Sequence, residues 1–588
     1  MNNFLILSGL KYLFPEKKNN NIYSLYEDHF ENKKTFQEIY SKVLIEKNRW
    51  SNRKILKKDK NYLFKLNKEI INNIYKKLNE LHKVNYSKKF WSILISPWSI
   101  YFLQLIFNRW HQTQMILKKN KISHVNIVEF KNEKNLTPSD TKEFHNYYQG
   151  HLWNQYVNQK ILFFLTKKIK YIKKKKIISI KITPKVKEKK NIFINFFSFL
   201  LKFANKKNYK YFIYSTYLGM WREFLLNVKL NQLPSFEKIK FEFKKDRIKL
   251  DLKKRSKLIN HIKPKNKFEK FFYNIFILQL PYVFFEKFPD LEKSFKSINL
   301  PTNPSKILSA EALWEETGKN YYIAKLLENN SKLYTIQHGG TYGIAQTHFN
   351  TNYELENSDK FISWGSSFNK NSKVIKLGTI KKKYNLKQNK NDTGNLLFII
   401  NKRHKYKTYL NTSLSHPFNF TKTLKFNTNF LLNLKDDIQK QTIIRPMPNT
   451  NFVKDYDFFE NLRYKFKFNS SKPVLQCYKE SKIAIHSLNS TSMLETLYYN
   501  MPTIIIYDSK IDPFTKEAQK IFKKLKKNNI FFDNPVSAAL FVNKIWNKGV
   551  YDWWYSPKVQ KTVNNFNLIF CKHNSKMLID LKNLLSKR

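Results

Sequence analysis

Short, continuous apolar runs that end in polar or basic residues constrain the fold of this 588-residue chain most. In its second half, such runs occupy residues 395–400, 442–444, 483–485 and 502–506. Runs of this length are typical of strands in a parallel sheet, because helices cover both faces of such a sheet. Segments with helical patterns separate the runs. We therefore predict an α/β fold built on doubly wound parallel sheets.

The first half of the chain shows the same alternation. A first strand is predicted to end at Gly9, and three more are predicted at residues 178–182, 211–215 and 306–309. A helix over residues 321–328 leads into a further apolar run. Strands alternating with helices again indicate a mainly parallel sheet.

Helical patterns fill much of the region between the first strands. Residues 22–86 are charged, with apolar residues at helical spacing. Residues 90–107 are apolar and nearly reach the length that spans a membrane, which is about 20 residues. Pro97 and several polar residues interrupt this stretch, so we predict a pair of buried helices with a turn near Pro97.

The length of the chain predicts several domains, roughly two to four. We predict an N-terminal α/β domain over residues 1–370, with a helical insertion at about residues 22–160. A second, Rossmann-like domain is predicted over residues 371–550. Residues 551–588 are predicted to be helical.

The formal net charge of +64 suggests an anionic partner. The lysines are spread along the whole sequence, in runs such as residues 173–176 and 381–383, and no known nucleic-acid-binding motif accompanies them. We therefore expect no specific nucleic acid partner. A general attraction to anionic surfaces, including peripheral contact with the inner face of the plasma membrane, explains the charge better. For the apolar residues 192–201, an ordinary core helix is favoured over membrane contact.

The two cysteines, Cys477 and Cys571, form neither a CxxC pair nor a spaced cluster. A disulfide framework or a thiolate zinc site is therefore not indicated. A reducing, cytoplasmic location fits this pattern best.

A cluster of glycines follows the apolar run that ends at residue 336. Residues 337–343 read QHGGTYG, so three of the 11 glycines in the chain lie within five residues. At the end of a strand, such a turn places the His338 side chain beside a backbone, at Gly339 and Gly340, that a phosphate or sugar can approach closely. The alternative is a tight turn with an incidental histidine.

A second strong pattern follows the run at residues 483–485. Ser490 or Thr491 is placed to cap a helix whose first amides and dipole favour an anion such as a nucleotide phosphate. Glu495, one turn further, is a candidate to accept hydrogen bonds from a ribose. The alternative is an acidic residue on an ordinary capped helix.

Two further strands are followed by basic residues. Arg403 and His404 come after the strand at residues 395–400, and Arg445 follows the next strand. Arginine binds phosphate in a bidentate manner, so these residues are candidates to bind a phosphate. No Asp-x-Asp element lies at a strand end, so we expect a metal-independent mechanism without a cofactor.

Taken together, these motifs resemble the GT-B glycosyltransferase architecture. More closely, the chain resembles the transferase family found in O-antigen and other surface-carbohydrate loci. The residues that carry this resemblance extend over nearly the whole sequence: Phe90, Trp91, Pro97, Trp98, Asn108, Arg109, residues 337–343, residues 354–365, Arg445, Pro446, residues 490–502, Trp553 and Trp554. One departure is His486, which stands where many relatives have an aspartate or another acceptor. The resemblance implies two Rossmann-like domains that face a cleft, with extra N-terminal helices. Residues 1–370 would form the acceptor side, residues 371–550 would bind the nucleotide sugar, and residues 551–588 would pack back across the cleft.

The resemblance also implies an activity, the transfer of a sugar from a nucleotide-activated donor to a glycan or lipid-linked acceptor. The nucleotide sugar is then a substrate and not a cofactor. His338 is the candidate general base, or alternatively a ligand of the donor phosphate. Glu354 and Glu356 alternate along a predicted strand and are candidates to supply the base or to orient acceptor hydroxyls, unless they form a solvated edge.

Two other functions remain open at this level. A teichoic-acid-type transferase of phosphoglycerol or a phosphosugar would share the fold and the histidine-glycine turn. A non-catalytic basic scaffold for membrane or nucleic acid would account for the charge alone.

Overall fold

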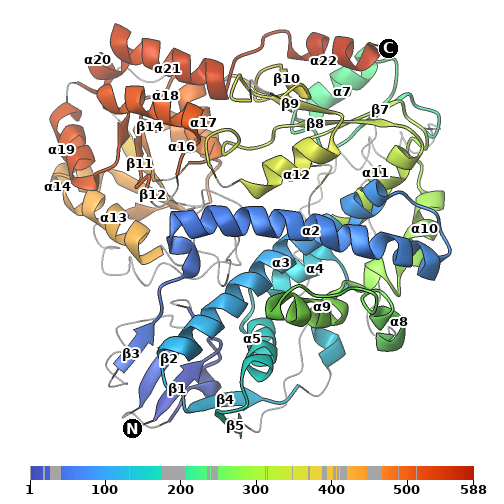
Figure 1. Cartoon of the computed structure of the whole chain (residues 1–588). Helices are drawn as coiled ribbons and strands as arrows, with labels where there is room; N and C mark the ends of the chain where they lie inside the picture. The colour runs from blue at the N-terminus through green and yellow to red at the C-terminus, as the bar shows by residue number, and fades with distance from the viewer. Residues whose placement is uncertain are drawn as a thin grey trace. The chain divides into compact units, whose positions relative to one another are not determined.

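The structure, a computed structural model, contains three parallel sheets surrounded by helices (Figure 1). It describes residues 2–16, 20–26, 42–130, 133–174, 206–234, 239, 249–311, 313, 316–346, 348–368, 371–386, 394–400, 406, 410, 420–446, 466–469, 471–487, 489–510, 513–547 and 549–587. The predicted strand at residues 178–182 and the apolar residues 192–201 lie outside these ranges. The predicted α/β class with parallel sheets is confirmed.

The chain forms two compact units that interleave in sequence. The first unit comprises Met1–Ser215, Asn227–Leu333 and Lys405–Tyr409. The second comprises Thr216–Leu226, Tyr334–His404 and Leu410–Arg588. The domain boundaries at residues 370 and 550 stay a prediction.

The first sheet has the strand order β3-β2-β1-β4-β5, and its strands pair in parallel. Its strands are β1 Asn3–Ile6, β2 Asn21–Ser24, β3 Lys42–Ile45, β4 His124–Val128 and β5 Lys170–Lys174. The first predicted strand is confirmed as β1. The helical pattern predicted from residue 22 is wrong for β2 and β3, where Ile22, Val43 and Ile45 favour extended backbone.

Two long helices follow in the first unit, α2 Arg53–His82 and α3 Lys88–Lys119. Residues 90–107 belong to the single helix α3, so the predicted helix pair is wrong. Pro97 lies inside α3 and removes one backbone hydrogen bond, but Trp91, Trp98 and their neighbours are fully buried around it. That burial outweighs the local cost of the proline.

Among the helices that the structure describes, α3 is the one that is long and apolar enough to cross a membrane. Within its most apolar window, 94% is buried inside the protein. A core helix passes the same test of length and composition.

The second sheet has the order β10-β9-β8-β7-β6. Its strands are β6 Tyr211–Ile213, β7 Lys306–Ser309, β8 Lys332–Ile336, β9 Lys360–Ser363 and β10 Val374–Lys376. The helix predicted before β8 is confirmed as α11 Thr317–Glu328. The strands predicted at residues 211–215 and 306–309 are confirmed as β6 and β7.

The third sheet has the order β13-β12-β11-β14-β15-β16. Its strands are β11 Asn395–Ile400, β12 Thr442–Pro446, β13 Lys467–Phe468, β14 Ser481–His486, β15 Thr503–Ile506 and β16 Phe531–Phe532. All four apolar runs of the second half are thus strands, as predicted. Counted from β11, this is the order 3-2-1-4-5-6 of dinucleotide-binding folds, which reverses between β11 and β14.

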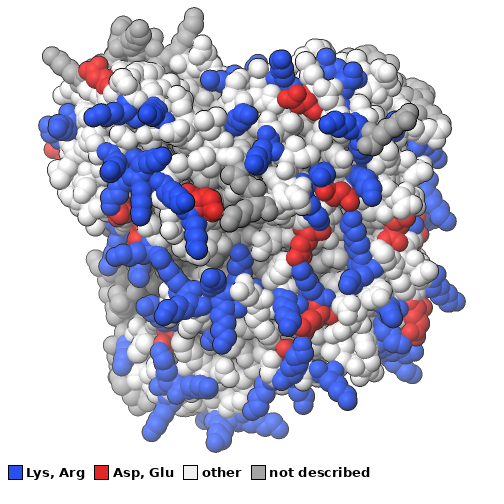
Figure 2. Space-filling view, turned by 45° about the horizontal axis from the view of Figure 1, so that its top comes forward, with Lys and Arg blue, Asp and Glu red and all other residues white. Residues whose placement is uncertain are grey.

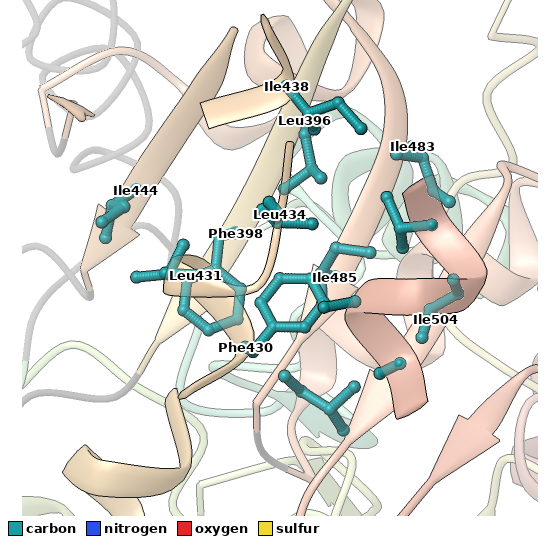
Figure 3. Packing of buried hydrophobic residues seen from close by; sticks show 14 of the residues in the cluster. Leu396, Phe398, Phe430, Leu431, Leu434, Ile438, Ile444, Ile483, Ile485 and Ile504 are labelled. Carbon is teal, nitrogen blue, oxygen red and sulfur yellow. The ribbon is translucent and has the colours of Figure 1, made fainter. Parts of the chain in front are cut away.

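The core of the third sheet explains why its strands are apolar throughout. Phe398 of β11 and Ile485 of β14 are fully buried and pack with Phe430 and Leu431 of α13 Phe420–Leu432 (Figure 3). The rings of Phe398 and Phe430 stack with their centroids 5.3 Å apart. Helices therefore cover this sheet and keep its carboxyl edge available for polar groups.

The other helices connect or cover the strands. The α-helices are α4 Thr141–Tyr147, α5 His151–Leu165, α7 Met220–Lys229, α8 Leu252–Ser256, α9 Lys267–Gln279, α10 Phe288–Ser297, α12 Phe349–Asn357, α14 Asp436–Lys440, α16 Val474–Lys479, α17 Thr491–Tyr498, α18 Lys516–Lys527, α19 Pro535–Ile545, α20 Val550–Tyr555, α21 Pro557–Phe570 and α22 Met577–Ser586. The 3-10 helices are η1 Lys11–Leu13, η3 Arg49–Ser51, η4 Glu133–Leu136 and η7 Tyr282–Phe284. The predicted helical character of residues 551–588 is confirmed, whereas their packing across a cleft stays a prediction.

Candidate functional site

The QHGG turn follows β8 and is held by its own first side chain. The Gln337 side-chain oxygen accepts a hydrogen bond from the Trp364 backbone N–H at 3.0 Å, and its amide nitrogen donates to the Gly339 carbonyl at 2.9 Å. The Gln337 backbone N–H donates to the Ile362 carbonyl at 2.9 Å. Gln337 is 1% exposed, so these bonds fix the turn in a water-poor setting.

Two of the three glycines in the turn are needed by the backbone. A Cβ on Gly340 would lie 2.4 Å from the Ser490 carbonyl oxygen, and a Cβ on Gly343 would lie 2.5 Å from the Ser367 side chain. Gly343 also has φ +72°, which L-residues rarely adopt. A Cβ on Gly339 meets only ordinary contacts at 3.7 Å or more. Gly340 therefore lets the turn approach the N-terminus of α17 closely, and Gly343 lets it pack against Ser367.

His338 is joined to a buried acid through a tyrosine. The Tyr342 hydroxyl lies 2.8 Å and 3.0 Å from the Glu354 carboxylate oxygens, and 3.1 Å and 3.3 Å from the two ring nitrogens of His338. The phenol donates to the carboxylate, so its oxygen accepts from an imidazole N–H. Tyr342 and Glu354 are 1% and 3% exposed, whereas the His338 side chain is 18% exposed. The arrangement orients His338 and leaves part of its ring accessible.

Glu354 and Glu356 lie on helix α12, so the predicted strand is wrong. A short alternating pattern is compatible with either structure, and the helix places residues two apart on different sides. Glu354 therefore faces Tyr342, whereas Glu356 is exposed. The structure brings only the first of the two acids to His338.

Tyr342 is a functional candidate to which the sequence analysis assigns no role. It lies four residues after His338 within the glycine-rich turn, and burial of its hydroxyl requires a hydrogen-bond partner. Its position in the QHGG-x-YG motif was the available signal.

The N-terminus of α17 is capped as the sequence predicts. Ser490 is the N-cap residue, and its hydroxyl accepts a hydrogen bond from the Met493 N–H at 3.4 Å. The Thr491 hydroxyl accepts from the Gly340 N–H at 3.2 Å. Thr491 thus ties the QHGG turn to the end of a helix whose dipole favours an anion.

His486 closes β14 behind this helix and is fully buried. Its Nε2 lies 2.9 Å from the Thr496 hydroxyl. Burial lowers the pKa of His486 to about 3 because the charged imidazolium would lose its hydration. His486 is therefore a neutral, structural histidine at this edge of the sheet.

Glu495 and Arg445 both already have protein partners. Glu495 forms an ion pair with Lys381 at 2.9 Å and accepts a hydrogen bond from the Tyr478 hydroxyl at 3.3 Å. Arg445 is 7% exposed, and its Nη1 donates to the Asn469 carbonyl at 3.4 Å and to the Cys477 sulfur at 3.3 Å. A role for either in donor binding stays a prediction. Arg403 and His404 lie outside the described residues.

Metal ligands do not gather in the parts of the chain that the structure describes: no group of three or more His, Cys, Asp or Glu side chains is placed to hold an ion. The second unit brings together three groups: the His338 imidazole with its hydrogen bond to Tyr342, the close-packed QHGG turn, and the capped N-terminus of α17. Such a set can accept a proton and stabilise an anion.

Comparisons with known proteins place the chain among transferases. The sequence model described as LIC12162 family transferase matches residues 3–585. A search of curated proteins gives no significant match. Similar solved structures include the wall teichoic acid polymerase TagF soaked with CDPG, the pneumococcal O-GlcNAc transferase GtfA in complex with UDP and GlcNAc, and MurG from Acinetobacter baumannii.

These structural similarities are distant. For TagF, the identity is 10%, the TM-score 0.27, and the match covers 48% of this chain and 71% of that one. For GtfA the corresponding values are 10%, 0.32, 50% and 59%, and for MurG they are 11%, 0.29, 51% and 76%. At these TM-scores the similarities assign no site or substrate to this chain.

Proposed function

Because the chain belongs to the LIC12162 family of transferases, we propose that it is a GT-B-type glycosyltransferase of surface-glycan synthesis. It would move a sugar from a nucleotide-activated donor to a polysaccharide or lipopolysaccharide acceptor, such as O-antigen or capsule. In this reaction the acceptor oxygen bonds to the sugar carbon, the bond from that carbon to the phosphate oxygen breaks, and the nucleotide leaves. The acceptor hydroxyl must lose a proton while the leaving phosphate gains negative charge.

The link from His338 through Tyr342 to Glu354 is the observation that carries this proposal. His338 takes the proton of the acceptor hydroxyl, with one ring nitrogen held by the Tyr342 hydroxyl. The imidazolium that results lies 4.0 Å from the Glu354 carboxylate, whose negative charge stabilises it. Glu354 and Tyr342 are thus positioning residues, and His338 is the base.

The N-terminus of α17 is the candidate site for the leaving phosphate. Its first-turn amides and dipole supply positive potential, and Gly339 leaves room for a phosphate beside the turn, whereas Gly340 packs directly against the start of α17. Arg403, His404 and Arg445 remain candidates to add charge. Fixed amides and cations then act without a metal or a cofactor, and the nucleotide sugar is a substrate.

Glu495 supports a donor site of this kind. Lys381 and Tyr478 hold its carboxylate in one orientation, one turn inside α17. A carboxylate offers about four acceptor sites, so two protein bonds leave capacity for ribose hydroxyls.

The charge of the protein favours a place at an anionic surface. Lys and Arg side chains extend over the whole face drawn in Figure 2, with few acidic residues between them. We propose that this charge holds a cytoplasmic protein peripherally at the inner face of the plasma membrane, where a lipid-linked acceptor would be accessible.

A thermal-shift panel of UDP-, GDP-, CDP- and dTDP-linked sugars tests the proposal. A donor at 100 times its Kd stabilises the native state by about 2.7 kcal/mol, which raises the unfolding temperature. The mass of the product formed with that donor distinguishes a glycoside from the phosphodiester of a teichoic-acid-type enzyme. If no nucleotide sugar raises the unfolding temperature, the proposal fails.

His338→Ala separates catalysis from a scaffold role. We expect this variant to bind the donor with an unchanged thermal shift and to lose at least about 100-fold in turnover, because a general base contributes this much. A scaffold would instead respond to the loss of lysines and not to His338→Ala. Turnover measured by release of the nucleotide checks the difference.

A further inference from the structure

A strained loop with exposed aromatic residues lies beside His338. Residues 215–219 connect β6 to α7, and three of these five have positive φ: Ser215 at 48°, Tyr217 at 60° and Gly219 at 86°. For a bulky aromatic residue such as Tyr217, this conformation is a genuine outlier. Strain of this kind persists only where the surrounding structure enforces it, and it concentrates at functional sites.

Hydrogen bonds hold the loop in this conformation. The Thr216 hydroxyl donates to the Glu223 carboxylate at 2.6 Å and accepts from the Leu218 N–H at 3.3 Å. In the first turn of α7, the Arg222 guanidinium donates to the Ile380 carbonyl at 2.6 Å. The loop is therefore a preorganised surface, which reduces the entropy lost when a ligand binds.

The loop and the first turn of α7 together expose large apolar side chains. Tyr217 is 50% exposed, Met220 53% and Trp221 68%, which is the highest value for a large hydrophobic side chain among the residues that the structure describes. Trp221 stacks on Phe224 with ring centroids 5.4 Å apart, so its plane is fixed while its outer face is open. Exposed aromatic faces that are held rigidly are typical of binding sites.

Tyr217 connects this surface to the proposed base. Its ring is nearly parallel to the His338 ring, with an interplanar angle of 20° and centroids 6.2 Å apart. The exposed surface of Tyr217 therefore adjoins the ring of the proposed base.

We propose that Tyr217 and Trp221 form the acceptor subsite, on which the apolar face of an acceptor pyranose stacks. The C–H groups on one face of a sugar ring match the electron-rich face of an aromatic ring, and its hydroxyls stay at the edge where a base can reach them. The donor phosphate is assigned to α17, whereas Tyr217 contacts the His338 ring from a different element, the loop before α7. This inference rests on the proposed sugar transfer.

Saturation-transfer NMR with simple sugars tests the subsite without any nucleotide. The probes are the methyl glycosides of glucose, galactose and N-acetylglucosamine, with glycerol as a hydroxyl-rich probe that lacks a ring. We expect at least one glycoside to receive saturation at its ring C–H protons, and glycerol to receive none. The dissociation constant of that glycoside should rise roughly tenfold in Tyr217→Ala and in Trp221→Ala, as expected when one aromatic stacking contact is lost.

Matched variants separate stacking from folding. Tyr217→Phe and Trp221→Phe keep an aromatic face and should keep the signal, as should Tyr555→Ala, which removes an equally exposed tyrosine in the same unit. Tyr217→Gly relieves the positive φ, so it should raise the unfolding temperature while the sugar signal is lost. If Tyr217 had only a structural role, Tyr217→Gly would lower both the unfolding temperature and the sugar signal.

Three results would overturn the subsite. One is the absence of a signal from all three glycosides with the wild-type protein. Another is a signal that survives both alanine substitutions. The third is loss of binding to phosphatidylglycerol vesicles in Trp221→Ala with the sugar signals unchanged, which would make the loop a membrane anchor. Because no donor or turnover is involved, failure here leaves the proposed transfer to be judged by the nucleotide-sugar panel.

Discussion

The first and third sheets share a strand order but differ at the edge where ligands of α/β proteins bind. In the first sheet the order reverses between β1 and β4, and in the third between β11 and β14. In parallel sheets, such a reversal opens a crevice beyond the carboxyl ends of the two strands. Strand order alone would therefore give both sheets a binding site.

The edge of the first sheet is occupied by side chains of α5. The Asn158 amide donates to the Leu7 carbonyl at 2.7 Å, and the Gln159 amide exchanges two hydrogen bonds of 3.1 Å with the backbone of Val128. The Ser8 hydroxyl donates to Gln155 at 2.7 Å. Buried amides from one helix thus satisfy the backbone groups that a ligand would otherwise use.

The edge of the third sheet carries a different element. Beyond β14, the capped N-terminus of α17 meets the QHGG turn, with the partly exposed His338 beside it. The comparison shows that the strand order makes a crevice possible, whereas the side chains that fill it decide whether it can bind a ligand.

The largest expected effect comes from Gly340→Ala, which forces the turn away from α17. The added Cβ would meet backbone atoms of Ser490 and Thr491 within 2.7 Å, and a backbone cannot move aside easily. We expect a loss of about 3 kcal/mol in the free energy of unfolding, with loss of turnover. Urea unfolding and nucleotide release measure both.

Gly339→Ala is the matched control, because its Cβ meets only ordinary contacts. It should change the free energy of unfolding by less than about 1 kcal/mol. If Gly339→Ala and Gly340→Ala lost the same free energy of unfolding, the close contact of the turn with α17 would not be the reason for a glycine at position 340.

The next effect is on catalysis at the third sheet. Glu354→Gln removes the charge that stabilises protonated His338, and we expect kcat to fall about 100-fold with little change in KM for the donor. Glu356→Gln, two residues further on the exposed side of α12, should leave kcat unchanged. If both variants were fully active, the tie from Glu354 to His338 would have no catalytic role.

A substitution at the edge of the first sheet should change the stability of the protein and leave its binding of a nucleotide sugar unchanged. Gln159→Leu leaves the N–H and carbonyl of Val128 without these bonds, at a cost of about 2 kcal/mol in the free energy of unfolding. The thermal shift caused by a nucleotide sugar should stay as in the wild type. Lys160→Met, at the neighbouring, partly exposed position, serves as the control. If Gln159→Leu alone lost the thermal shift caused by a nucleotide sugar, the ligand would bind at the first sheet.

The smallest effect is a pH dependence of stability from His486. Burial lowers its pKa to about 3, whereas in the unfolded chain it is about 6.5, so the unfolded state binds the proton first. Stability therefore falls as the pH decreases below about 6.5, by about 1 kcal/mol between pH 7 and pH 5.5.

His486→Gln should remove this share of the pH dependence, measured as unfolding free energies at the two pH values. His111 of the first unit, which is partly buried and whose pKa desolvation lowers to about 4, is the comparison site. If the free energy of unfolding of His486→Gln changed between the two pH values as in the wild type, His486 would be protonated in the folded protein as well.

The sequence predicted the features that depend on local pattern. Continuous apolar runs identified the strands of the third sheet, and Ser490 before an apolar helix identified the cap of α17. The same rules gave the glycine turn its position after β8. In each case a few neighbouring residues determine the conformation.

The errors arose where distant contacts decide. Pro97 suggested a break, but burial on all sides keeps α3 continuous. The alternation of Glu354 and Glu356 is compatible with a strand, but both residues lie on helix α12. The hydrogen bond from the Tyr342 hydroxyl holds Glu354 on the buried side of that helix. No role was predicted for the amides of α5, because their partners are backbone groups of strands far away in sequence.

Hydrogen–deuterium exchange on the whole protein tests the central claim, that the donor binds at the third sheet and not at the first. The nucleotide sugar with the largest thermal shift is added, and exchange is followed in peptides from both edges. We predict slower exchange in residues 337–343 and 489–494, with residues 7–13 and 155–159 unchanged. Protection confined to the peptides of the first sheet would contradict the assignment of the donor site to α17 and the QHGG turn.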